Sequence, residues 1–137
     1  MRGGIDLGGT KIQAIVVDDD HAIVGEARRP TPATGGPDDV IAALAEAQRE
    51  AAAAAGTTTE ALAGVGLGSP GDVDAGAGTI AQAGNLPNWR DPVPVGERLG
   101  ALLGTRVAIG NDVSVATKAE YELGAGRPYR SLLGVFW

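Results

Sequence analysis

Two short runs of apolar and β-branched residues open the chain, and only a brief glycine turn separates them. We expect strands at residues 4–7 and 12–18, because β-branched side chains favour the extended state. A link this short cannot cross a sheet, so the two strands must be antiparallel neighbours. A third strand is expected at residues 22–29, which extends the pair to a meander of three strands.

Helical and extended patterns alternate through the rest of the chain. Apolar residues recur at helical spacing over residues 38–55, between Pro37, which suits a first helical turn, and Gly56, which suits a helix stop. The other expected elements are strands at 63–67, 106–109 and 131–137, helices at 95–103 and 113–123, and an irregular loop at 68–94. The order β-β-β-α-β-α-β-α predicts an α/β fold whose mixed sheet is covered by helices.

Composition narrows the possible functions. The chain has no Cys and one His, His21, so its own residues offer no disulfide, thiolate metal site or His-based metal cluster. The net charge is −6 and no stripe of Lys and Arg offsets it, so we expect no nucleic-acid partner. No apolar run approaches the roughly 18–20 residues that a membrane span needs. We therefore expect a cytoplasmic protein without a membrane partner.

A first candidate site follows the first expected strand, in the sequence DLGGTK. Bare backbone N–H groups, a hydroxyl and an ammonium suit a phosphate, and the carboxylate could hold Mg²⁺ directly or through water. The spacing is not that of a Walker P-loop. The alternative is a plain hairpin turn with a solvated lysine. The candidate residues are Asp6, Gly8, Gly9, Thr10 and Lys11.

A second glycine motif, GLGSPG at residues 66–71, matches the pattern G-x-G-x-x-G after a strand. A dinucleotide site needs a helix to begin at this point, and Pro70 and Gly71 disfavour one. The sequence instead favours a turn that exposes backbone in a cleft.

Polar residues in the long loop and before the last helix complete the candidates. The amide of Asn85 could bind sugar hydroxyls or form a loop-stabilising turn, and Trp89 could wall a pocket or fix the loop to the core. Asn111 and Asp112 lie between a strand and a helix. Asp112 could be a helix N-cap, or a carboxylate that accepts the proton of an attacking hydroxyl.

The order and spacing of these motifs together resemble the ROK family of sugar kinases and related repressors, particularly its bacterial glucokinase-like members. The resemblance covers essentially the whole chain. It implies the actin-like ATPase, ribonuclease H-like fold, in which two lobes flank a cleft. Residues 1–130 would form the N-terminal lobe, and residues 131–137 would be the first strand of a missing C-terminal lobe.

The resemblance implies a kinase that transfers the γ-phosphate of ATP to a hexose hydroxyl, and dimers are expected when the protein is full length. The glycine turn would bind the phosphates of ATP and Asp6 would assist Mg²⁺, while Asp112 would act as general base. The residues implied for the phosphates are Gly8, Gly9, Thr10 and Lys11, and those implied for the sugar are Gly71, Asn85, Asn111 and Asp112.

The chain departs from the family pattern in two ways. Val113 and Ser114 replace the Ala and Asn that commonly follow the Asn-Asp pair, and both would face away from the cleft if Asp112 caps the helix. The family's second phosphate loop, adenosine pocket, Glu-x-Gly-His sugar motif and structural Zn²⁺ site would lie beyond Trp137. We therefore expect a truncated chain that is inactive alone.

Two other classes of function stay open. A transcriptional regulator of the same family carries a helix-turn-helix segment before the kinase-like domain, and we expect no room for one before Asp6. A non-catalytic sugar-binding module is the other alternative. The identity of the sugar, and the choice among ATP, ADP and polyphosphate as donor, are also open.

Overall fold

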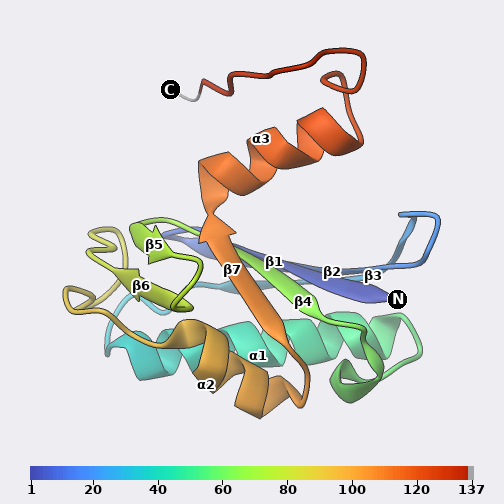
Figure 1. The fold of residues 1–137 in the computed structure, drawn as a ribbon. Coiled ribbons are helices and arrows are strands. Elements are labelled where there is room, and N and C mark those ends of the chain that lie inside the picture. Colours follow the sequence, from blue (N-terminus) through green and yellow to red (C-terminus); the bar gives the residue numbers. More distant parts are fainter. Residues whose placement is uncertain (136–137) are drawn as a thin grey trace.

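A five-stranded mixed sheet forms the centre of the molecule (Figure 1). The computed structural model describes residues 1–135. The strands lie in the order β3-β2-β1-β4-β7; β2 is antiparallel to both β1 and β3, and β4 runs parallel to β1 and β7. The α/β class and the opening meander are thus confirmed. The strands are β1 (Arg2–Leu7), β2 (Lys11–Val17), β3 (Ile23–Pro30), β4 (Val65–Ser69) and β7 (Val107–Asn111).

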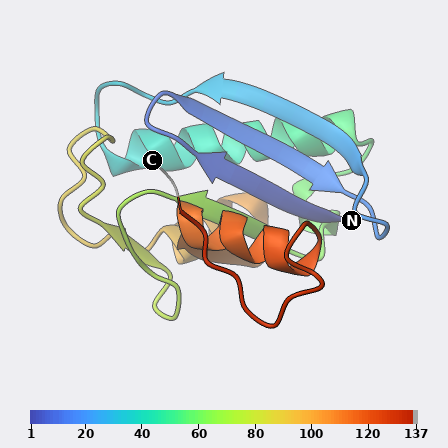
Figure 2. The same ribbon diagram turned by 90° about the horizontal axis from the view of Figure 1, so that it is seen from above.

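Helices α1 (Pro37–Ala54) and α2 (Val95–Leu103) cover one face of the sheet (Figures 1 and 2). Buried and partly buried residues alternate along β2, which shows the face that the helices cover. Ile12, Ala14 and Val16 are buried beneath the helices, while the residues between them are only partly buried. Helix α1 begins with its proline, as expected, and its apolar stripe faces the sheet. The hydrophobic core therefore lies between the sheet and these two helices.

Strand β3 touches α1 through bare backbone at Gly25. A Cβ atom at Gly25 would collide with the carbonyl oxygen of Ala51, and would lie 2.7 Å from the nitrogen and 2.8 Å from the Cβ of Ala55. Real Cβ atoms essentially never make contacts this short, so only glycine lets helix and strand approach this closely.

Helix α3 (Asp112–Glu122) lies on the opposite face of the sheet, where it stands apart from α1 and α2 (Figure 1). None of its residues is buried. The sheet beneath its first turn carries glycines: a Cβ at Gly110 would lie 2.6 Å from Cγ2 of Val115, and one at Gly68 would lie 3.7 Å from Cα of Asp112. The glycine at position 110 therefore lets the start of α3 come close to the sheet, whereas a Cβ at Gly68 would make only ordinary contact.

The long loop expected at residues 68–94 contains regular structure. Strands β5 (Asp72–Asp74) and β6 (Thr79–Ala81) form a two-stranded sheet within it. Outside this loop, a 3₁₀ turn at Thr59–Ala61 precedes β4. Trp89 is buried, and its Nε1–H donates to the carbonyl oxygen of Ile80 at 3.0 Å. The indole therefore fixes the loop to the core, which decides between the two roles open to it from the sequence.

The strand expected at residues 131–137 is wrong for the part that the structure describes. Residues 131–135 have no regular secondary structure, and Phe136 and Trp137 lie outside the described residues. A strand needs a neighbour for its backbone groups. The segment instead runs beyond α3, away from both edges of the sheet (Figure 1).

Among residues 1–135, no helix combines the length and apolar character that a membrane crossing requires.

Candidate active site

Residues from three motifs meet at the carboxyl ends of the central strands. The register places Asp6 beside Gly68, and Gly68 beside Gly110, across β1, β4 and β7. Asn111 is the last residue of β7, and Asp112 is the first residue of α3. In open α/β sheets, ligands bind outside the carboxyl ends of the strands. The fold therefore brings the first and last candidate motifs, far apart in sequence, to one edge.

Asp6 and Asp112 line the same groove, which has a volume of about 540 Å³ and lies between the sheet and α3. Most of its other lining residues are apolar or glycine, including Ile15, Ala108 and Val115. Asp6 is exposed and Asp112 is partly buried. The two carboxylates are thus the only charged groups among the residues that line this groove.

Gln13 also lines the groove, and sequence reasoning missed it. It lies opposite Asp6 in the β1–β2 register. Strand alternation offered a signal, because Gln13 falls between the buried residues Ile12 and Ala14 and must face the other side of the sheet. The amide of Gln13 adds a hydrogen-bonding group beside the Asp6 carboxylate.

The glycine turn lies at the same edge of the sheet but outside the residues that line the groove. The N–H of Gly8 donates to the carbonyl oxygen of Lys11 at 2.9 Å, which closes the turn. A Cβ at Gly9 would lie 3.1 Å from Nδ2 of Asn85 and 3.2 Å from its Cβ. The candidate phosphate turn and the candidate sugar residue are therefore in direct contact.

The start of α3 differs from the expectation that Asp112 is its cap. Asn111 is the N-cap: its Oδ1 accepts a hydrogen bond from the N–H of Ser114 at 3.3 Å. Asp112 is the first helical residue, and its Oδ1 accepts from the N–H of Val113 at 2.8 Å. Strand β7 continues to Asn111, two residues beyond the strand that the sequence predicts, and α3 begins at the next residue, so no linker is left and the cap falls on Asn111. Acidic side chains are favoured in the first turn of a helix, where they interact with the positive end of its dipole.

Gly71 lies where the chain bends from β4 into β5. Its φ of +92° is in the left-handed region, and a Cβ there would lie 2.6 Å from the carbonyl oxygen of Ala81. A strand, β5, follows it where a dinucleotide site would need a helix. The residue is exposed and is not among those that line the groove.

Within residues 1–135 there is no group of three or more His, Cys, Asp or Glu side chains that could hold a metal ion. Mg²⁺ does not need one, because it usually keeps several waters and takes one or two carboxylates together with substrate phosphates. The exposed Asp6 carboxylate fits that limited role.

Comparison with known proteins agrees with this architecture. The "Glucokinase" of Streptomyces coelicolor is 34% identical over 130 residues, which are 95% of this chain and 38% of that protein. The crystal structure of a ROK hexokinase from Thermus thermophilus superposes with a TM-score of 0.80 at 38% identity, over 91% of this chain and 39% of that one.

A second solved structure is a ROK family glucokinase from Streptomyces griseus in complex with glucose and AMPPNP, with a TM-score of 0.79 at 32% identity. The match covers 91% of this chain and 37% of that one. The chain thus spans about two fifths of the length of these relatives. The model of the family described as "ROK family" matches residues 2–136, and the chain therefore belongs to the ROK family.

Proposed function

We propose that this chain forms one wall of the active site of an ATP-dependent sugar kinase. The observation that carries the proposal is the shared groove: Asp6 and Asp112 line it together, although 106 positions separate them in the sequence. The contact between Gly9 and Asn85 adds support, because it joins the candidate donor and acceptor sites. The glucose and AMPPNP complex of the Streptomyces griseus relative is consistent with both substrates.

In the proposed reaction, the Asp112 carboxylate accepts the proton of a sugar hydroxyl. The hydroxyl oxygen bonds to the γ-phosphorus of ATP as the bond from that phosphorus to the bridging oxygen breaks, and ADP leaves. Phosphoryl transfer depends on positioning and charge stabilisation more than on a strong base, so an ionised carboxylate in the first turn of a helix suffices. Its fixed position on α3 is what the reaction requires.

The remaining candidates hold the two substrates. Backbone N–H groups of the glycine turn and the ammonium of Lys11 would bind the phosphates of ATP, with the hydroxyl of Thr10 as a further donor. Asp6 would hold Mg²⁺, which supplies positive charge to the phosphates. The sugar hydroxyls would meet the exposed amide of Asn85, the amide N–H₂ of Asn111 and the backbone at Gly71.

Three further predictions from the sequence remain proposals: a cytoplasmic location, a homodimer, and a structural Zn²⁺ site outside this chain. The chain itself has no Cys and one His, so it offers no closed set of zinc ligands.

The gene product that contains these residues should form ADP in the presence of ATP, Mg²⁺ and a suitable sugar. A coupled ADP assay across hexoses and N-acyl hexosamines, each compared with a reaction without sugar, measures this activity. The 137 residues alone should show no measurable turnover, because they provide a single phosphate turn and an open groove that does not exclude water. Tight sugar binding without ADP formation would favour the non-catalytic module.

A further inference from the structure

The segment that follows β3 holds the glycine turn through one buried residue, Thr31, which is 6% exposed. The hydroxyl of Thr31 donates to the carbonyl oxygen of Gly8 at 2.7 Å. Its backbone N–H donates to the carbonyl oxygen of Thr10 at 3.0 Å. Thr31 therefore forms hydrogen bonds to the turn on both sides of Gly9, one from its side chain and one from its backbone.

These two bonds also fix the direction of N–H groups in the turn. The N–H and C=O of a trans peptide point to opposite sides, and the described residues contain no cis peptide bond. With the carbonyls of Gly8 and Thr10 directed at Thr31, the N–H groups of Gly9 and Lys11 are directed away from it. A glycine turn is otherwise free to adopt many conformations, so this orientation needs an external partner.

The same segment reaches the loop that carries Asn85. The side-chain Nδ2 of Asn88 donates to the carbonyl oxygen of Gly35 at 2.6 Å, and Asn88 itself has a left-handed φ of 51°. Asn85, three residues earlier, lies against Gly9. The segment from Thr31 to Gly35 thus connects the glycine turn with the candidate sugar loop.

We propose that Thr31 is a positioning residue for the phosphate donor. It acts through the glycine turn, where it aims the N–H of Gly9 at the phosphates before they bind. The inference rests on the proposed function, since the turn is assigned to phosphates there. Preorganised N–H groups bind a ligand more tightly because they lose less conformational entropy on binding. Removal of the Thr31 hydroxyl should therefore weaken binding of the phosphate donor and leave the sugar site intact.

The test compares Thr31→Val, which keeps the shape and removes the hydroxyl, with the wild-type gene product. We expect KM for ATP to rise roughly 5–50-fold, since the partly buried carbonyl of Gly8 loses its partner, with KM for the sugar unchanged within about twofold. Thr31→Ser retains the hydroxyl and should restore KM for ATP to within about threefold of the wild-type value.

Thr105→Val is the matched control. The hydroxyl of Thr105 donates to the carbonyl oxygen of Leu62 at 3.0 Å, just before β7 begins and so at the opposite end of that strand from the site. This variant loses the same kind of hydrogen bond and should leave KM for ATP unchanged. A general loss of stability would affect both variants alike, whereas a positioning role separates them.

Amide hydrogen exchange gives a readout that does not depend on activity. In Thr31→Val, exchange at residues 8–11 should accelerate about tenfold or more relative to Thr105→Val, because the hydroxyl bond that holds the carbonyl of Gly8 is lost and only the backbone bond to Thr10 remains. If Thr31→Val does not fold, Thr31→Ala replaces it with the same expectations, since it only removes atoms.

Three results would overturn the inference: wild-type KM for ATP in Thr31→Val, an equal rise in Thr105→Val, or no rescue by Thr31→Ser. A wild-type gene product without activity on any sugar would instead refute the proposed function. The exchange comparison then still decides whether Thr31 holds the turn.

Discussion

Replacement of Asp112 by Asn should lower kcat for sugar phosphorylation about 10²–10⁴-fold, which is the usual contribution of a general base. The amide keeps the size of the side chain and its hydrogen bond to the N–H of Val113, but it cannot accept the proton of the sugar hydroxyl. Steady-state kinetics of the gene product measure the loss of kcat. Sugar binding, followed by calorimetry, should change less than about threefold because both side chains accept hydrogen bonds.

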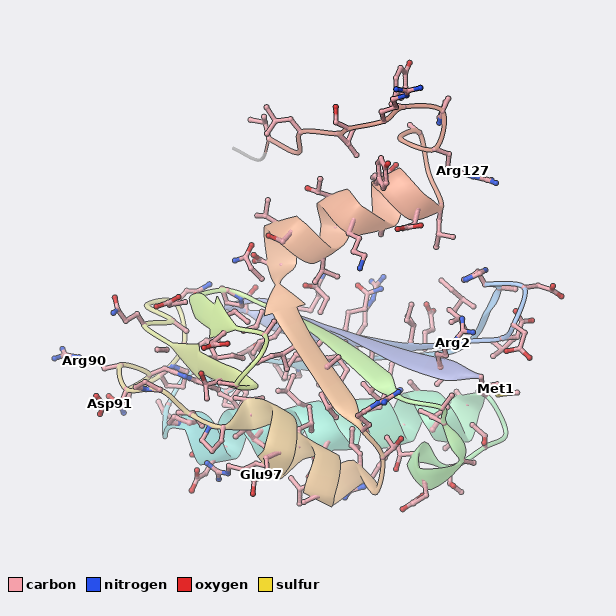
Figure 3. All side chains as sticks on the ribbon, in the orientation of Figure 1. Met1, Arg2, Arg90, Asp91, Glu97 and Arg127 are labelled. Atoms are coloured by element: carbon pink, nitrogen blue, oxygen red, sulfur yellow. The ribbon has the colours of Figure 1, made fainter. Side chains whose placement is uncertain are left out.

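Asp91→Asn is the control for this loss. Asp91 is exposed, and Figure 3 shows it on a loop that points outward from the molecule. The same loss of one negative charge there should leave kcat unchanged, which excludes an effect of net charge alone. Unchanged turnover in Asp112→Asn would remove Asp112 from the mechanism.

Replacement of Gly25 by Ala should destabilise the fold by about 1–3 kcal/mol, the usual range for overpacking a well-filled core. The new methyl group would meet the backbone of α1 at Ala51 and Ala55, and backbone cannot swing aside as a side chain can. Either α1 or β3 must shift, and both belong to the core. Equilibrium urea unfolding, followed by far-ultraviolet circular dichroism, measures the change in free energy.

Gly66→Ala is the matched control, since Gly66 is also a glycine inside a strand. A Cβ there meets no heavy atom within 4 Å, because Gly66 faces the groove. The change should therefore alter stability by less than about 1 kcal/mol, and the reduced freedom of the unfolded chain works in favour of the variant. Equal destabilisation by the two substitutions would show that contact with α1 is not the cause.

The sequence predicted the fold correctly where a long periodic pattern or a short connection allowed few arrangements of the chain. The turn between β1 and β2 forced antiparallel pairing, and the apolar spacing of α1 predicted a long helix that the structure confirms. Strands β5 and β6 escaped detection because three residues are too few to establish an alternation. Their position depends on the buried Trp89, whose partner becomes known only from the fold.

Some residues of the candidate site could likewise be predicted from the sequence, and others could not. Residue types predicted the candidates Asp6 and Asp112, because carboxylates at strand ends are chemically conspicuous. Their common groove depends on strand register, which the sequence leaves open across the β4 crossover. Thr31 and Gln13 were missed because each is an ordinary polar residue, and only its partners in the fold give it a role.

Helix α3 buries none of its side chains, so its far end contributes little to the stability of the molecule. Its first turn is different, since it lies against the sheet at Gly68 and Gly110. Asp112 belongs to that first turn. The proposed proton acceptor is therefore held against the sheet at the carboxyl ends of β4 and β7, and its position does not depend on the exposed far end of α3.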